Sequence, residues 1–213
     1  MTEEEARRIL MKRFDVSRET LVRISAFVDL LRAENERQNL ISQTTSEHIW
    51  SRHVLDSAQL LRFMPQCAGT WLDLGTGAGF PGLIIAAMNP IQVTMIESRR
   101  LRVDFLQRAA ETLGLPGSTQ ILCERVERLD LPHQDVISAR AFAPLERLFD
   151  LAQRFAASET RWVLPKGRNA QSELDAARAS WQGMFHVEPS LTDPEAGIII
   201  AERVQRKGRG EAK

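Results

Sequence analysis

Glycines at positions 75, 77 and 79 follow directly on a short apolar segment, and this turn constrains the fold more than any other feature of the chain. The stretch reads LDLGTGAGFPG over residues 72–82. Glycines let the backbone turn sharply and leave room for a ligand against the main chain, while Pro81 suits the first turn of a helix. The pattern predicts a strand, a tight turn and a helix whose free N–H groups favour a carboxylate or phosphate. It implies a nucleotide-like or carboxylate-bearing cofactor.

Short apolar runs alternate with helical stretches from residue 70 onward. Strands are predicted at residues 70–74, 92–96, 119–123, 135–138, 161–164, 185–187 and 197–201. Helices are predicted at residues 81–88, 100–113, 145–157 and 170–184. This alternation predicts an α/β fold with a mostly parallel sheet that is covered on both faces and connected by right-handed crossovers.

Residues 1–66 are predicted to be helical throughout. The pairs Thr2 with Glu5 and Thr44 with Glu47 have the spacing of a capping box, so each is predicted to open a helix. Between them, apolar residues recur every three to four positions on a helix expected at about 18–37: Leu21, Ile24, Phe27, Val28 and Leu31. The chain is therefore divided into a helical extension over 1–66, a sheet domain over 67–203 and a basic, disordered tail over 204–213.

Composition excludes several classes of protein. The 213 residues carry 28 basic and 28 acidic side chains, so the chain is not a uniformly basic nucleic-acid binder, although a local basic face remains compatible with neutrality. Hydrophobic residues at 43% and charged residues at 26% are typical of a globular protein. Cys67 and Cys123 are too few for a disulfide framework or a structural zinc site, and no metal is expected. A charged N-terminus and the lack of a long apolar run predict a cytoplasmic protein.

Three cofactors compete for the glycine turn. A P-loop is excluded because Leu83 and Ile84 stand where Lys and Ser/Thr are required. The dinucleotide fingerprint fails from Gly75, since Phe80 replaces its third glycine, and fits from Gly77, which does not follow the strand directly. S-adenosylmethionine carries no phosphate and needs only room for its methionine end, so the shorter turn favours it.

An acidic residue closes the second predicted strand. Glu97 lies near the offset of about 20 residues from the glycine turn at which a carboxylate meets ribose hydroxyls. A solvated acid at a strand end is the alternative interpretation. Together with the turn, the position favours a ribose contact.

Several segments resemble one family. They are LDLGTGAGFPG, VTMIES at 93–98, RVDFLQ at 102–107, VISARA at 136–141 and LPKG at 164–167, with NL at 39–40 and RHVLDS at 52–57 upstream. The chain resembles the bacterial 16S ribosomal RNA guanine-N7 methyltransferase G family, also called the glucose-inhibited division protein B family, from about residue 39 to 167. The combination of GTGAGFPG with the upstream RHxxDS is specific, whereas the glycine turn alone indicates only a methyltransferase.

The resemblance implies a Rossmann-like, seven-stranded methyltransferase sheet with a helical N-terminal extension. It implies that S-adenosyl-L-methionine is used to methylate N7 of a single guanine in 16S ribosomal RNA, which by the resemblance is nucleotide 527. The cofactor contacts that it implies are Gly75, Phe80, Val126, Glu127 and Arg140. The wider methyltransferase pattern adds Glu97 for the ribose, although the family usually has Asp at that position.

The sequence lacks motifs that methylation at other base positions requires, and this agrees with methylation at N7. N7 of guanine has a lone pair and carries no proton to remove, so direct methyl transfer needs geometry rather than a general base. The segment after the fourth strand, SARA at 138–141, lacks the Asn/Asp-Pro-Pro-aromatic pattern of exocyclic-amine methyltransferases. Neither cysteine lies there to form a covalent intermediate, and Cys123 is predicted to be a buried apolar residue.

Four further positions are interpreted individually. We expect Arg140 to contact the cofactor, the base or an RNA phosphate, with a plain salt bridge as the alternative. His53 has Asp56 three residues on, but packing of the extension on the sheet explains it better than acid-base work. Lys166 is either a phosphate contact or a strand-end cation. The tryptophans are predicted to be core residues: Trp50, Trp71, Trp162 and Trp181.

Contact with RNA must come from local charge. Two stretches, 99–108 and 201–213, each carry three more basic than acidic residues and are candidates for phosphate positioning. The expected partner is 16S ribosomal RNA, either naked or within a small-subunit assembly intermediate. Two alternatives stay open: an NAD-dependent oxidoreductase that uses the Gly77 register, and a noncatalytic ribosome assembly factor that binds RNA.

Overall fold

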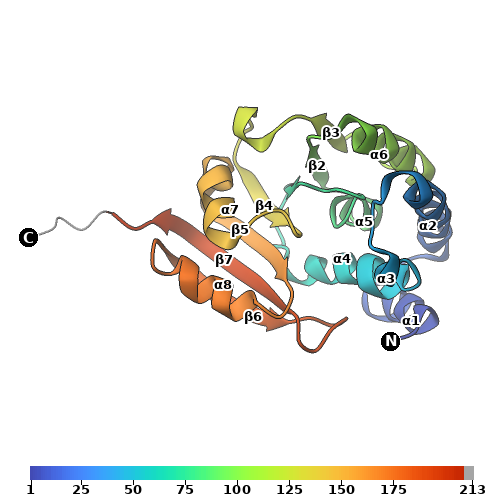
Figure 1. The fold of residues 1–213 in the computed structure, drawn as a ribbon, viewed down its shortest axis with the longest axis horizontal. Helices are drawn as coiled ribbons and strands as arrows, with labels where there is room; N and C mark the ends of the chain where they lie inside the picture. The colour runs from blue at the N-terminus through green and yellow to red at the C-terminus, as the bar shows by residue number, and fades with distance from the viewer. Residues whose placement is uncertain (209–213) are drawn as a thin grey trace, which may run out of the picture.

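The computed structural model describes residues 1–208, and their fold is built on one seven-stranded sheet (Figure 1). Its strands are β1 (Thr70–Leu74), β2 (Gln92–Glu97), β3 (Gln120–Cys123), β4 (Gln134–Ala139), β5 (Ala156–Lys166), β6 (Trp181–Pro189) and β7 (Gly197–Arg206). The strand order is β3-β2-β1-β4-β5-β7-β6. The first five strands of this order run parallel, while β7 is antiparallel to both of its neighbours. The predicted α/β class and mostly parallel sheet are confirmed.

Helices cover both faces of the sheet. They are α1 (Glu3–Arg13), α2 (Arg18–Gln38), α3 (Gln43–Ser46), α4 (Asp56–Ala58), α5 (Gly82–Met88), α6 (Arg100–Leu113), α7 (Leu145–Ala152) and α8 (Ala170–Ala177). A π-helical turn, η1 (Trp50–Leu55), precedes α4, and three 3₁₀ turns complete the set: η2 (Gln59–Phe63), η3 (Val126–Arg128) and η4 (Gln153–Phe155). The first six α-helices lie on the side of the sheet away from α7 and α8 (Figure 1).

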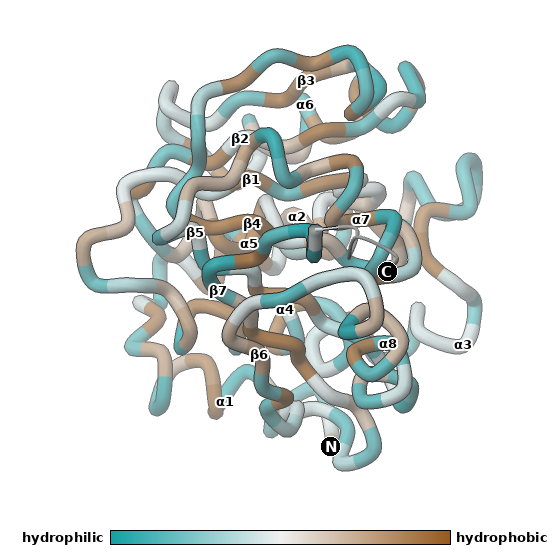
Figure 2. Tube along the Cα trace, turned by 90° about the vertical axis from the view of Figure 1, so that its left-hand side faces the viewer, coloured by the Kyte–Doolittle hydropathy of each residue, from teal (hydrophilic) through white to brown (hydrophobic). Residues whose placement is uncertain are grey.

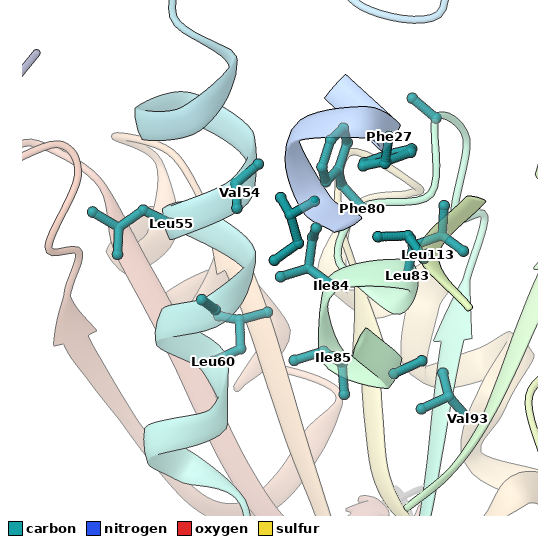
Figure 3. Close-up of a cluster of buried hydrophobic side chains, with 14 of the residues drawn as sticks. Phe27, Val54, Leu55, Leu60, Phe80, Leu83, Ile84, Ile85, Val93 and Leu113 are labelled. Atoms are coloured by element: carbon teal, nitrogen blue, oxygen red, sulfur yellow. The ribbon is translucent and has the colours of Figure 1, made fainter. Parts of the chain in front are cut away.

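Two apolar clusters form the core, one on each face of the sheet. Figure 2 shows hydrophobic residues along the central strands β1 and β4. Alternate residues of β1 take opposite faces: Trp71 joins the cluster beneath α2, α5 and α6, whereas Leu72 joins the one beneath α7 and α8. The larger cluster is drawn in Figure 3, where Phe80 lies beside Phe27 and Ile84 of α5 faces Val54 of η1. Side chains of the N-terminal helices and of the sheet thus share one core.

The N-terminal helices follow their local signals in part. The capping box of Thr2 and Glu5 is present, with the Glu5 N–H donating to the Thr2 hydroxyl at 3.1 Å. The predicted box of Thr44 and Glu47 is wrong, because α3 begins at Gln43 after Ser42 and has no side-chain cap. The apolar stripe of α2 is confirmed, since four of its five members are buried and Leu21 packs against the same cluster: Leu21, Ile24, Phe27, Val28 and Leu31.

Glu3 ties the first helix to the π-helical turn. Its carboxylate accepts the backbone N–H groups of Trp50 at 3.1 Å and Ser51 at 3.3 Å. These N–H groups lie at the start of η1, where a helix lacks internal partners for them. The first helix therefore supports the segment that carries Arg52 and His53.

Three predictions after residue 140 need correction. The helix expected over 145–157 ends at Ala152, continues as η4 and gives way to β5 at Ala156. The helix expected over 170–184 ends at Ala177, because residues from Trp181 onward pair with β7. The disorder expected from Val204 is wrong for residues 204–206, which extend β7, and residues 209–213 lie outside the described part of the chain.

The burial predicted for Cys123 is wrong, whereas the burial predicted for the tryptophans is confirmed. Cys123 is exposed at the end of β3, so its predicted burial is wrong. All four tryptophans are buried, as predicted. Among residues 1–208, no helix combines the length and the apolar character needed to cross a membrane, and no cluster of His, Cys, Asp and Glu has the composition of a metal site.

Candidate active site

The glycine turn leaves β1 at the edge of the sheet where the parallel strands end. Gly75 has a φ of +65° and Gly79 a φ of +93°, a backbone conformation that residues with a Cβ rarely adopt. A Cβ at Gly75 would lie 2.4 Å from Cδ2 of Phe142, so this aromatic ring closes over the turn. The turn thus requires glycine for its backbone conformation and for the close approach of Phe142.

A buried carboxylate supports the turn from below. Asp73 of β1 is fully buried and accepts hydrogen bonds from the Ser138 hydroxyl at 2.8 Å and the Gly82 N–H at 3.1 Å. The indole N–H of Trp71 donates to the same serine at 2.8 Å. Burial raises the pKa of Asp73, and hydrogen bonds from Thr76, Ser138 and Gly82 oppose that rise. The acid inside an apolar strand was a signal for this role that the sequence analysis did not use.

A cavity of about 430 Å³ opens beside the glycine turn. Four of the six predicted cofactor residues line it: Gly75, Glu97, Val126 and Glu127. They come from the ends of β1 and β2 and from η3, which follows β3, so parallel strands bring them to one edge. Segment 141–144 also lines it, as do four arginines and four further residues: Arg99, Arg102, Arg125, Arg147, Ile96, Ser98, Glu124 and Leu151. We call this space the cofactor cavity.

Glu97 holds a fixed position in the wall of the cofactor cavity. Its side chain is buried, one carboxylate oxygen accepts the Arg99 N–H at 2.9 Å, and the other lies 3.4 Å from Nη1 of Arg102. Both partners belong to the start of α6, so the second strand and the following helix orient the acid together. This is the strand-end position at which the sequence predicts a ribose contact.

Phe80 and Arg140 do not line the cofactor cavity. The Phe80 ring is buried in the larger apolar cluster, 5.6 Å from the ring centroid of Phe27, which leaves only its backbone for a contact in the turn. Arg140, directly after β4, has its guanidinium 5.2 Å from the Phe80 ring centroid. Its Nη1 donates to the carbonyl of Arg52 at 3.4 Å and lies 3.7 Å from a carboxylate oxygen of Asp56. The salt bridge considered as an alternative is present, and Arg140 faces other cavities.

His53 is a packing residue in this arrangement. Its ring stacks on Phe80 with centroids 5.0 Å apart and an interplanar angle of 22°. Burial, with help from Arg140 and Arg52, lowers its pKa to about 3, so the imidazole is neutral at physiological pH. Within residues 1–208, neither ring nitrogen has a hydrogen-bond partner. Asp56 instead accepts from the Thr192 hydroxyl at 2.7 Å, and these contacts agree with the packing interpretation of His53.

A second cavity of about 680 Å³ adjoins the first, and we call it the base cavity. Arg140 lines it together with residues 165–169, which end β5 and follow it, and with Glu173 of α8. Segment 141–144 lines both cavities and is therefore the wall between them. Lys166 stabilises this wall, because its ammonium donates to the Ala143 carbonyl at 2.9 Å and to Glu173 at 2.8 Å.

Arg154 supports the far wall of the cofactor cavity and was missed by the sequence analysis. From η4 its guanidinium donates to the carbonyl of Glu127 at 3.2 Å and to that of Val126. Only the fold brings these segments together, so no local pattern marks the residue. Arg154 fixes the backbone of η3 without lining the cavity itself.

Replacing Arg154 by alanine is expected to weaken S-adenosylmethionine binding about tenfold, since two hydrogen bonds that position η3 are lost. Calorimetric titration measures this change. Alanine at Arg128, an exposed residue of the same turn, is the control and should leave the affinity unchanged. Equal affinities for the Arg154 variant and the unmodified protein would show that η3 keeps its position without this contact.

The first basic stretch and the described part of the second, residues 201–208, lie at opposite ends of the strands. In the first stretch, three arginines form ion pairs: Arg102 with Glu97, Arg100 with Asp104 at 2.9 Å, and Arg108 with buried Glu34 at 2.7 Å. This stretch borders the cofactor cavity. Residues 201–206 of the second stretch form the last part of β7, which runs antiparallel to β5 and so ends at the edge away from both cavities. There Arg206 pairs with Asp150 at 2.6 Å. Of the described residues in the two stretches, those of the first lie near the candidate active site.

Solved structures share this fold. MtNAS in complex with S-adenosylmethionine aligns with a TM-score of 0.57 at 17% identity, covering 95% of this chain and 84% of that chain. An rRNA methylase from Streptococcus thermophilus aligns with a TM-score of 0.51 at 13% identity, covering 72% of this chain and 98% of that chain. At such identities the likeness concerns the fold alone. The sheet and its glycine-turn cavity place this chain in the class of proteins that share this fold.

Sequence relatives identify the family within that class. The family model described as rRNA small subunit methyltransferase G matches residues 20–193. A relative of that name in Rhizorhabdus wittichii is 50% identical over 213 residues, covering 99% of this chain and 97% of its own length. Another in Zymomonas mobilis is 46% identical over 221 residues, covering 100% and 99%.

The chain belongs to the rRNA small subunit methyltransferase G family. The resemblance stated from the motifs is thereby confirmed, as are the seven-stranded methyltransferase fold and S-adenosyl-L-methionine as the cofactor. Family membership also decides for methyl transfer over the NAD-dependent alternative.

Proposed function

We propose that the chain methylates N7 of one guanine in 16S ribosomal RNA, with S-adenosylmethionine in the cofactor cavity and the guanine in the base cavity. One observation carries this assignment: segment 141–144 lines both cavities, so molecules bound in the two cavities would lie next to each other at this segment. Methyl transfer requires donor and acceptor in contact and aligned, which adjoining cavities provide.

The residues of the cofactor cavity suit S-adenosylmethionine. Gly75 lines the cavity with its backbone alone, the fixed carboxylate of Glu97 can accept from ribose hydroxyls, and η3 offers the apolar side chain of Val126. When bound, the cofactor supplies a methyl group already activated on a sulfonium. Phe80 would contribute through its backbone, and Arg140 would act from the base cavity.

The protein's own part in the reaction is positioning. N7 of guanine carries no proton, so the site needs no base at that atom. Arg140 is held between Asp56, the Arg52 carbonyl and the Phe80 ring, which fixes its guanidinium in the lining of the base cavity. A planar guanidinium in that place can stack on the base or bind its phosphate.

The substrate in this proposal is 16S RNA, naked or within an assembling small subunit, and the enzyme acts in the cytoplasm where that RNA is found. The test is chemical cleavage at 7-methylguanosine in 16S RNA from cells with and without the protein. Cleavage at one guanine should vanish in cells that lack the protein and return with the unmodified chain. Cleavage that persists without the protein would instead favour a noncatalytic assembly factor.

The first basic stretch is proposed to contact RNA phosphates. A cavity of about 460 Å³ beside it is lined by Arg37, Gln38 and residues 99–102, and it shares Arg99 and Arg102 with the cofactor cavity. The side chains of Arg37 and Arg100 are about three-quarters exposed, at 77% and 74%. Their nearest carboxylates are Glu34, 4.0 Å from Arg37, and Asp104, which pairs with Arg100.

Alanine at both Arg37 and Arg100 is expected to weaken RNA binding about tenfold and to reduce the slope of log affinity against log salt by about one to two. Filter binding at several salt concentrations measures both quantities. Neither residue lines the cofactor cavity, so S-adenosylmethionine affinity should not change. Alanine at Arg8 and Arg13 of α1 is the matched control. A salt slope equal to that of the unmodified protein would remove this surface from the RNA interface.

A further inference from the structure

We propose that Glu173 and Lys166 form a guanine-recognition subsite in the base cavity. The Glu173 carboxylate accepts from N1–H and the 2-amino group of the base, and the Lys166 ammonium donates to O6. This inference rests on the proposed function and extends it, because it names the groups that select guanine.

The pair presents an acceptor and a donor side by side in the cavity wall. Lys166 stands at the end of β5 with 10% of its side chain exposed, and Glu173 on α8 with 31% exposed. Oε2 of Glu173 accepts from Lys166 at 2.8 Å and from the Leu145 N–H at 3.2 Å. Oε1 makes no hydrogen bond to any residue within 1–208, which leaves it available to a ligand. Both residues line the base cavity.

Guanine matches this pair and adenine does not. The Watson–Crick edge of guanine carries two neighbouring donors, N1–H and the 2-amino group, next to the O6 acceptor. Adenine has an amino donor in place of O6 and an acceptor at N1, so it would set a donor against Lys166 and an acceptor against Glu173. A carboxylate beside an ammonium is therefore complementary to guanine alone of the two purines.

The same contact would orient the reacting atom. N7 lies on a different edge of the purine from N1 and the 2-amino group, so a base held by Glu173 turns N7 away from this carboxylate. O6 is the neighbour of N7, so Lys166 at O6 stands on the side of the base that carries the reacting atom. Lys166 also binds the carbonyl of Ala143, in the wall shared with the cofactor cavity. Recognition of one edge and exposure of N7 to the donor would then be two results of one contact.

If Glu173 and Lys166 only stabilised the cavity wall, their replacement would have a different effect on substrate choice. Glu173 holds the Leu145 N–H and Lys166 holds the Ala143 carbonyl, so loss of either would disturb the wall for every substrate. Overall rate and thermal stability therefore cannot separate the two roles. The ratio of rates on two bases that differ only at the 2-amino group can.

The experiment uses small-subunit particles whose 16S RNA carries either guanine or inosine at the target position. Inosine lacks only the 2-amino group, so the unmodified enzyme should methylate it about ten- to a hundredfold more slowly, the loss expected for a hydrogen bond to a charged acceptor. In Glu173→Gln, the Leu145 N–H and Lys166 are expected to donate to the amide oxygen, so the amide nitrogen lies where Oε1 of Glu173 lies in the unmodified protein. Guanine should then be methylated more slowly and the guanine-to-inosine ratio should fall to about one.

Asp175→Asn is the matched control, since Asp175 is an exposed acid on the same helix and pairs with Arg178. It should keep the ratio of the unmodified enzyme. A ratio near one for the unmodified enzyme, or a Glu173→Gln variant that slows both bases equally, overturns the subsite. If the unmodified enzyme transfers no methyl group to particles that carry guanine, the proposed function itself fails, and the subsite fails with it.

Discussion

Replacing Arg140 by alanine is expected to lower kcat/KM for methylation of 16S RNA about a hundredfold while the protein stays folded. Misplacement of a reacting group by about an ångström has an effect of that size. Asp56 would lose an ion pair at 3.7 Å but keep the Thr192 hydroxyl and the Gln59 amide, so the loss of stability should be small. Initial rates of methyl incorporation measure the effect, with a thermal melt to verify folding.

Cofactor titration separates the two possible roles of Arg140. Because its side chain lines the base cavity, the variant should bind S-adenosylmethionine with nearly unchanged affinity. A large loss of affinity would instead support the cofactor contact that the family resemblance implies. Arg32→Ala, which removes an exposed ion pair on α2, is the control and should be fully active. Unchanged turnover of Arg140→Ala on unmodified 16S RNA would contradict the positioning role.

Replacing Gly75 by alanine is expected to weaken S-adenosylmethionine binding by about a hundredfold. The φ of +65° costs a residue with a Cβ about 1–2 kcal/mol. The new Cβ would also lie 2.4 Å from Phe142, and displacing a packed ring costs a similar amount. The turn can relieve both only by moving away from the cavity, and the two costs together correspond to about two orders of magnitude in affinity.

Calorimetric titration against the cofactor tests the glycine prediction. Gly117→Ala is the matched control, because a Cβ there meets nothing within 4 Å. The control should bind the cofactor like the unmodified protein. A Gly75→Ala variant that melts at a lower temperature but binds with unchanged affinity would assign the glycine to the fold rather than to the cofactor site.

Helix boundaries were predicted best where a residue with a strong local preference, such as a C-terminal glycine, ends the helix. The helix at 100–113 was predicted to the residue, since Gly114 in a left-handed conformation ends it. The helix expected over 170–184 failed, because strand pairing between Trp181 and Arg206 prevails over local helix preference, and that pairing is long-range. The π-helical turn at Trp50–Leu55 has no sequence signature, and Glu3 caps it from far along the chain.

The residues of the candidate site also fall into those that local sequence signals predicted and those that depend on the tertiary fold. Gly75 follows β1 directly and Glu97 is the last residue of β2, so their spacing alone placed them at the edge of the sheet where the cofactor cavity lies. Phe142, Arg154 and Glu173 were missed, because each acts on a segment that only the tertiary fold brings near. Burial of Phe80 and exposure of Cys123 depend on the packing of neighbouring elements, which a strand-end position does not reveal.

The shared wall at residues 141–144 has a thermodynamic consequence. One backbone segment touches both cavities, so any shift that it makes when one cavity fills alters the affinity of the other cavity. Such linkage is reciprocal: whatever free energy the cofactor adds to RNA binding, RNA adds equally to cofactor binding. Binding at the two cavities is therefore described by two dissociation constants together with one cooperativity factor that both share.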